Sequence, residues 1–217
     1  MEDKVRILIA DDHPIFREGL VRTIERNSNF IVAAQTADGA EALRLIRELH
    51  PDLAVLDVAM PKMDGLEVAR RVHQEALPTE LVVLTMYNDS KYFNAAFDLG
   101  VRGYILKDGV ATELLSCLEA VTSGLYYVSP TVAHLLIEWN RVARSHPDSN
   151  SIRDSITPAE LTILRLVAEN KTNKEIAEKL FVSIRTVENH RTHICQKLGI
   201  KGHNALLQFA LENKSRL

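Results

Sequence analysis

The chain has 217 residues, of which 46% are hydrophobic and 25% charged, and its formal net charge at pH 7 is -3. That length exceeds most single domains and that composition excludes disordered and fibrous proteins, so we expect two globular domains. No window holds the roughly 18 unbroken apolar residues that a membrane span requires, and the first ten residues do not resemble a signal peptide. We therefore expect a cytoplasmic protein without a membrane partner.

Charge is divided unevenly along the chain. Residues 152–217 hold 11 Lys and Arg against 7 Asp and Glu, whereas residues 1–151 hold 15 against 22. An acidic N-terminal part is thus joined to a basic C-terminal part, which is compatible with a nucleic-acid partner for the latter.

Short aliphatic segments alternate with helical periodicity through the first 125 residues. We predict strands at Val5–Ala10, Phe30–Ala34, Leu53–Asp57, Leu81–Thr85 and Gly103–Leu106. After each strand, apolar residues recur three or four positions apart, as in Phe16, Leu20 and Ile24, which predicts a helix. Five such repeats indicate an α/β fold with a five-stranded doubly wound parallel sheet.

The remainder of the chain reads as a connecting segment and an all-α domain. In residues 126–155 we predict a linker that includes a helix at about 130–144, with Ser129 as its N-cap and Pro130 at its first position. Residues 145–155 are rich in Ser, Asp and Asn, typical of a flexible segment. For residues 156–217 we predict four short helices at Pro158–Glu169, Asn173–Leu180, Ile184–Leu198 and about His203–Asn213.

Acidic residues stand at the predicted strand ends. Asp11 and Asp12 follow the first strand, and Asp57 ends the third. Carboxylates gathered in one crevice repel one another unless a cation shares them, and an all-oxygen site suits Mg²⁺. A single Asp in such a position is more often a helix cap, but the combination is more specific.

Two further strand ends carry groups suited to phosphoryl chemistry. Thr85 offers a hydroxyl and Lys107 a cation, which together position and stabilise phosphoryl oxygens. One carboxylate then serves as the nucleophile that forms an aspartyl phosphate, and we predict Asp57 for that role.

The first 125 residues resemble receiver domains, which have a flavodoxin-like fold. The matching motifs are Asp11-Asp12, the stretch 57–65 (DVAMPKMDG), Leu84-Thr85 and the stretch 103–108 (GYILKD). The resemblance implies that a sensor histidine kinase phosphorylates Asp57. It also implies Mg²⁺ ligands from the side chains of Asp12 and Asp57, with Asp11 nearby and the backbone of Ala59 contributing. Thr85 and Tyr104 would act as the switch residues.

The predicted helices 173–180 and 184–198, separated by three residues, have the pattern of a helix-turn-helix. One face of the second helix is polar and free to enter a major groove, with Arg185, Glu188, Asn189, Thr192 and Gln196. The neighbouring cations would contact phosphates: Lys174, Lys179, Arg191, Lys197 and Lys201. Thr186 completes the predicted DNA-binding set. A solvated polar face is the alternative interpretation.

The C-terminal part resembles the LuxR-type DNA-binding domain, and the whole chain resembles the NarL/FixJ class of response regulators. The matching stretches are 157–160 (TPAE), 173–177 (NKEIA), 186–190 (TVENH) and 197–200 (KLGI). The resemblance implies recognition by the third of four helices and a dimer, often formed through the last helix. Glu188 departs from the pattern, where Lys is common, so a base preference does not transfer.

These expectations combine into one hypothesis. The unphosphorylated protein is mainly a monomer in which the receiver and the helix at 129–144 hinder the recognition helix or its dimer surface. Phosphorylation at Asp57 releases this hindrance, and a homodimer then binds promoter DNA, with RNA polymerase as a further partner. We expect no enzymatic activity apart from the transfer of a phosphoryl group to Asp57 and its hydrolysis. Two rivals remain open: an aspartyl-phosphate hydrolase, and a regulator that acts through protein contacts or without phosphate.

Overall fold

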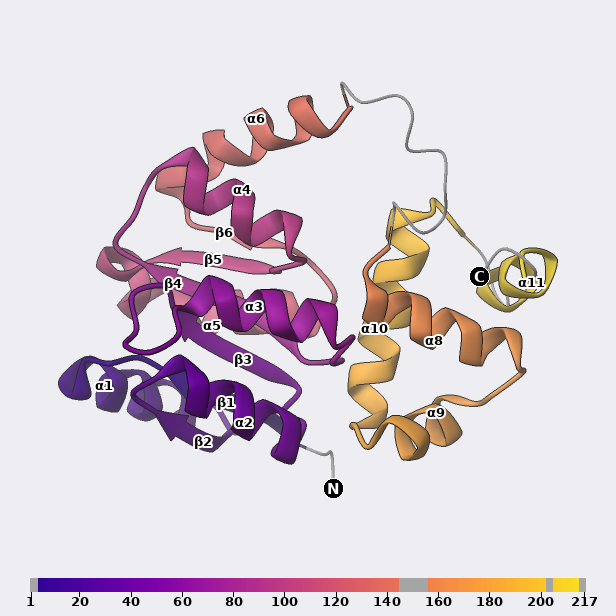
Figure 1. Cartoon of the computed structure of the whole chain (residues 1–217), viewed down its shortest axis with the longest axis horizontal. Coiled ribbons are helices and arrows are strands. Elements are labelled where there is room, and N and C mark those ends of the chain that lie inside the picture. The colour runs from indigo at the N-terminus through magenta and orange to yellow at the C-terminus, as the bar shows by residue number, and fades with distance from the viewer. Residues whose placement is uncertain (1–3, 145–155, 202–204, 215–217) are drawn as a thin grey trace.

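The computed structural model describes residues 4–144, 156–201 and 205–214. Figure 1 shows a sheet flanked by helices, formed by the N-terminal part of the chain, beside an all-helical C-terminal part. The expected linker at residues 145–155 lies outside the described residues. None of the described helices is long and apolar enough to cross a membrane.

A parallel sheet forms the centre of the N-terminal part, with strand order β2-β1-β3-β4-β5-β6. The strands are β1 (Val5–Ala10), β2 (Phe30–Thr36), β3 (Leu53–Asp57), β4 (Glu80–Thr85), β5 (Gly103–Leu106) and β6 (Tyr127–Val128). Every residue of β3 and β4 is buried, which explains their continuous aliphatic sequences, because a central parallel strand is covered on both faces.

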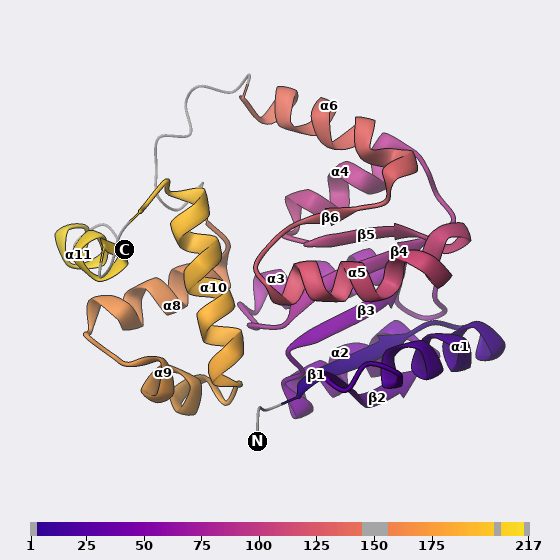
Figure 2. The same cartoon turned by 180° about the vertical axis from the view of Figure 1, so that it is seen from behind.

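Helices cover both faces of this sheet, as a doubly wound fold requires. On one face lie α2 (Gly39–Leu49), α3 (Gly65–Gln74) and α4 (Ser90–Asp98), and on the other lie α1 (Pro14–Glu25) and α5 (Val110–Thr122). Figures 1 and 2 show these two faces in turn. Asp38, Asp64 and Asp89 cap α2, α3 and α4 by accepting hydrogen bonds from backbone N–H groups in the first turn.

The segment after α5 contains a strand that the sequence did not predict. Tyr127 and Val128 pair with Gly103 and Tyr104 to form the sixth strand. Two residues are too short to show the alternation by which strands are recognised. Ser129 also differs from its prediction as a helix cap, because its hydroxyl accepts a hydrogen bond from the Leu106 N–H and donates one to Glu113.

Helix α6 (Ala133–Arg144) follows a short 3₁₀ turn and packs against α4. The Trp139 indole N–H donates to the Asp98 carboxylate at 2.9 Å, and its ring lies 5.4 Å from that of Phe97. The described contacts of this helix therefore extend the core of the receiver-like part.

The C-terminal part consists of α8 (Pro158–Ala168), α9 (Asn173–Leu180), α10 (Ile184–Lys197) and α11 (Ala205–Glu212) around a core of their own. Thr157 with Glu160 and Thr172 with Glu175 form capping boxes at the starts of α8 and α9. Helix α9 ends at Phe181, whose φ of 57° is left-handed, and Ser183 then caps α10. This sharp turn sets the angle between the two helices of the helix-turn-helix.

Candidate functional site

The carboxyl ends of β1 and β3 bring three carboxylates into one pocket. Asp11 and Asp57 are fully buried, whereas the side chain of Asp12 is 35% exposed. Oxygens of these three residues and a ring nitrogen of His13 lie within 4.8 Å of one another. The parallel strands end at the same edge of the sheet, so the convergence follows from the topology.

Lys107, which directly follows β5, is the cation of this pocket. Its Nζ lies 2.7 Å from Asp57 Oδ2 and 2.8 Å from Asp11 Oδ2. Burial raises the pKa of Asp57, and the hydrogen bond from Lys107 opposes that effect only in part. Burial alone would lower the pKa of Lys107, but the two carboxylates raise it above its ordinary value. The lysine thus stays protonated and holds Asp57 in place.

The carboxylate oxygens of this pocket suit a hard cation. Asp11 Oδ2 and Asp12 Oδ1 are buried and form no well-aligned hydrogen bond within the described part of the chain. Their nearest charged neighbours are Lys107 Nζ at 2.8 Å and His13 Nδ1 at 2.7 Å, respectively. Mg²⁺ takes oxygen ligands and keeps several waters, so two or three carboxylates at one open edge match its requirements. The Ala59 N–H donates to Asp57 Oδ1 at 3.2 Å, which places the Ala59 backbone beside the same group.

Thr85 and Tyr104 belong to β4 and β5, the strands that follow β3 in the sheet. The Thr85 hydroxyl is buried at the end of β4 and accepts a hydrogen bond from the Tyr87 N–H at 2.9 Å. Tyr104 is fully buried against Phe93, and its hydroxyl donates to the Tyr87 carbonyl at 3.0 Å. Both residues therefore contact one loop, residues 86–89, which joins the strand end to α4.

Helix α10 presents three faces. Val187 and Ile194 point into the core of the C-terminal domain. Most of the predicted DNA-contacting side chains are exposed: Lys174, Arg185, Glu188, Thr192 and Gln196. Asn189 and Arg191 are half-buried.

The third face of α10 packs against the receiver-like part. It is formed by residues spaced four, three and four apart: Thr186, His190, His193 and Lys197. The hydroxyls of Ser183 and Thr186 both donate to Asp52, and His190 Nε2 lies 3.0 Å from the Pro78 carbonyl oxygen. Thr186 and Lys197 were predicted to contact DNA, but here they take part in contacts at or beside the domain interface. Sequence reasoning did not identify His190 and His193.

A buried ion pair joins the domains beside α10. Arg102, in the turn before β5, donates from Nη2 to Glu160 Oε1 at 2.6 Å, and both side chains are almost fully buried. Lys197 Nζ lies 2.7 Å from Glu160 Oε2. Burial alone would raise the pKa of Glu160, but Lys197 and Arg102 hold it below its ordinary value. Glu160 is therefore a charged bridge between the two domains.

The domain interface and the acidic pocket lie at opposite ends of the sheet. Asp52 and Glu80 stand at the amino ends of β3 and β4, while Asp57 and Thr85 stand at their carboxyl ends. Figure 2 shows α10 beside the end of the sheet that lies away from the loop leading into α4. A signal from the pocket must therefore cross the sheet to reach α10.

Two family models match the chain. Residues 7–119 match the response regulator receiver domain, and residues 154–210 match the bacterial regulatory proteins of the luxR family. The oxygen regulatory protein NreC of Staphylococcus carnosus (strain TM300) is 37% identical over 214 residues, which are 97% of this chain and 98% of that protein.

Solved structures are similar to part or to nearly all of the chain. A LuxR-family two-component response regulator from Aurantimonas sp. SI85-9A1 is 38% identical, with a TM-score of 0.60, over 64% of this chain and 99% of that one. The response regulator RcsB in complex with DNA is 28% identical, with a TM-score of 0.59, over 97% and 98%. The chain therefore belongs to the two-component response regulators that join a receiver domain to a LuxR-type DNA-binding domain and regulate transcription.

Proposed function

We propose that phosphorylation of Asp57 releases α10 from the receiver and thereby permits a dimer to bind promoter DNA. The observation that carries this proposal is the burial of one face of α10 against the amino ends of β3 and β4. In this closed arrangement Thr186 is 2% exposed, and Arg185, Glu188 and Asn189 line a cavity shared with Thr122 and Ser123 at the end of α5. Arg185 and Glu188 are themselves exposed, but Thr186 stays covered, so α10 cannot present its full predicted DNA-contacting set until the domains separate.

Within the pocket, an oxygen of the Asp57 carboxylate attacks the phosphorus of the donor, and the bond between phosphorus and the leaving group breaks. Mg²⁺, held by Asp11, Asp12 and Asp57 with the Ala59 backbone alongside, would neutralise charge on the phosphoryl oxygens. Lys107 is already within hydrogen-bond distance of Asp57 and exchanges part of that contact for a phosphoryl oxygen. A sensor histidine kinase is the physiological donor.

Thr85 and Tyr104 connect the pocket to a surface. The Thr85 hydroxyl now accepts a hydrogen bond from the Tyr87 N–H, and moving it toward the new phosphoryl group, to which it would donate, draws its oxygen away from that N–H. Tyr104 holds the carbonyl of the same Tyr87, so the loop before α4 and the face formed by α4 and β5 shift together. We propose that this shift weakens the docking of the DNA-binding domain.

Binding as a dimer on two half-sites multiplies the affinity of each α10, because the second contact becomes intramolecular. Structures of RcsB include dimers bound to DNA, which supports the same assembly here. Helix α11 is the expected dimer contact. RNA polymerase is a further partner, and the cytoplasm is the expected location.

The test is selection of fragments from a genomic DNA library, with and without Mg²⁺ and a small phosphodonor. We expect specific fragments only with the phosphodonor, and none with Asp57→Asn, which is nearly isosteric but lacks the nucleophile. Equal recovery in both states would make binding constitutive and refute the switch. Phosphate incorporation into Asp57→Asn would show that Asp57 is not the phosphoacceptor. Turnover of small phosphoesters by the protein would favour a hydrolase instead.

A further inference from the structure

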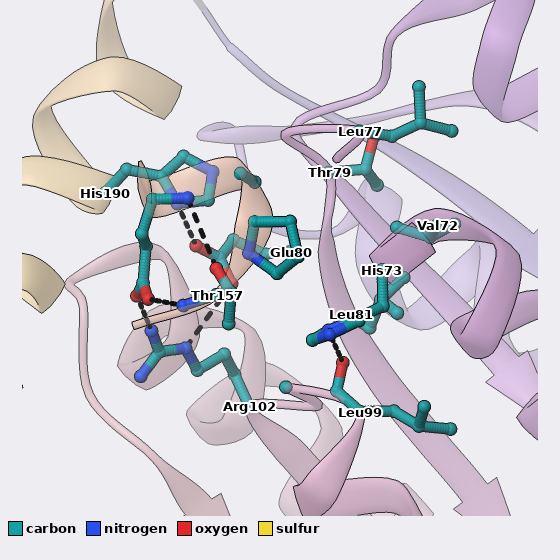
Figure 3. A pocket seen from close by; sticks show the side chains of 14 residues that line it. Val72, His73, Leu77, Thr79, Glu80, Leu81, Leu99, Arg102, Thr157 and His190 are labelled. Atoms are coloured by element: carbon teal, nitrogen blue, oxygen red, sulfur yellow. Dashed lines mark hydrogen bonds and ion pairs between the residues drawn. The ribbon is translucent and has the colours of Figure 1, made fainter. Parts of the chain in front are cut away.

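Three buried side chains of the domain interface converge on one point without forming hydrogen bonds there. Glu80 comes from the first position of β4, and His190 and His193 come from successive turns of α10. All three are at least nine-tenths buried. Glu80 Oε1 lies 3.5 Å from His190 Nδ1 and 3.1 Å from His193 Nδ1, and Figure 3 shows Glu80 and His190 facing each other across the interface.

The hydrogen bonds around this cluster fix the tautomer of His190. Its Nε2 lies 3.0 Å from the Pro78 carbonyl oxygen, which only accepts, so the ring proton resides on Nε2. In the neutral ring Nδ1 therefore presents a lone pair to a carboxylate oxygen. No hydrogen-bond partner within the described ranges is available to Glu80 Oε1, His190 Nδ1 or His193 Nδ1. Buried polar atoms of native proteins are rarely left without such a partner.

We propose that Glu80, His190 and His193 form a binding site for a divalent transition metal ion of the zinc class, shared by the two domains. Zinc bonds of about 2.0–2.1 Å to tetrahedral ligands place those ligands about 3.3 Å apart, and the two measured separations are 3.1 and 3.5 Å. Two imidazoles and one carboxylate are an established ligand set for zinc.

The surroundings of His190 and Glu80 match those of a ligating histidine and carboxylate, whereas His193 Nε2 has no hydrogen-bond partner within the described ranges. A metal-bound imidazole usually donates its other N–H to a backbone carbonyl, as His190 does to Pro78. Glu80 keeps Oε2 for Arg102, whose Nε lies 3.6 Å away, and leaves Oε1 for the ion. The positive charge of the Arg102 guanidinium lowers the affinity of the site for a metal cation. A moderate affinity suits a site that forms when the domains close and is lost when they separate.

Such a site would act on the switch because its ligands belong to different domains. The ion would bind the closed arrangement and not the open one. At a free concentration of about 100 times its dissociation constant, it would lower the open fraction about 100-fold. This consequence rests on the proposed release of α10, but binding of the ion itself does not.

The test is calorimetric titration of the full chain with Zn²⁺ in excess Mg²⁺, which keeps the acidic receiver pocket occupied, with Co²⁺ absorption as a second readout. We expect the wild type to bind one more equivalent than His193→Ala and Glu80→Gln, and to show a visible Co²⁺ band that both variants lose. His134→Ala, which removes an exposed histidine, should match the wild type. Thermal unfolding of each variant verifies that it is folded.

Equal stoichiometry and affinity in the wild type and in both folded variants would overturn the site, as would a wild type that binds no Zn²⁺. If these titrations confirm the site but Zn²⁺ does not change phosphodonor-dependent DNA recovery, the metal site itself is still supported. That result would instead contradict the proposed closed-to-open switch.

Discussion

Replacing Arg102 by methionine should open the closed arrangement without phosphorylation. Methionine keeps most of the apolar length of the arginine side chain but removes the guanidinium that pairs with Glu160 at 2.6 Å. Glu160 would then be buried with Lys197 as its remaining cation at that site, whereas domain separation would return the carboxylate to water. The substitution therefore raises the free energy of the closed state relative to the open one.

The size of the effect follows from the burial of the pair. Removing one partner of a buried ion pair costs about 3–5 kcal/mol, and the lower value applies here because Lys197 remains. About 3 kcal/mol corresponds to a change of roughly 100-fold in the ratio of open to closed protein. When the binding-competent state is a minor one, the apparent affinity for DNA rises by the same factor.

The assay is fluorescence anisotropy of a duplex recovered in the genomic selection, titrated with unphosphorylated protein. Small-angle scattering should show a larger radius of gyration for Arg102→Met than for the wild type. The matched control is Arg47→Met, which removes an exposed ion pair to Glu75 that is worth at most about 1 kcal/mol. If Arg102→Met and the wild type have the same DNA affinity and the same radius of gyration, the ion pair between Arg102 and Glu160 does not restrain α10.

Three further outcomes are expected. Phe93→Ala should lower the free energy of unfolding by about 3–5 kcal/mol in urea titrations, because Phe93 is fully buried against Phe97 and Tyr104; a loss below about 1 kcal/mol would contradict this packing. Thr172→Ala should cost about 1 kcal/mol by removing the capping box of α9, and unchanged unfolding would show that the cap is dispensable. Chelation of Mg²⁺ should stop phosphate incorporation measured by mass spectrometry, and equal incorporation would argue against a metal-dependent pocket.

Much of the acidic pocket could be predicted from local pattern. Asp11, Asp57 and Lys107 each follow or end a short aliphatic segment, and the carboxyl ends of parallel strands meet at one edge. The helix boundaries likewise follow from caps such as Thr157 and Thr172, whose side chains satisfy backbone donors within three residues. The role of each residue in phosphoryl transfer stays a prediction.

The sequence could not reveal what covers α10. Thr186, His190 and His193 are polar, and a polar residue on a helix face is ordinarily exposed, so nothing in their pattern distinguishes a solvated face from a docked one. The sixth strand was missed for a similar reason, because Tyr127 and Val128 form a strand only through their pairing with β5.

By itself, then, the sequence determined the α/β and all-α folds, the family and the carboxylates of the pocket, because periodicity, caps and strand ends are properties of neighbouring residues. The tertiary structure alone decided that α10 is held at the end of the sheet opposite the acidic pocket. It joins Asp52 to Thr186, 134 positions later, and Glu80 to two histidines of another domain. Such contacts depend on how two separately folded surfaces complement each other, and no spacing along the chain encodes that.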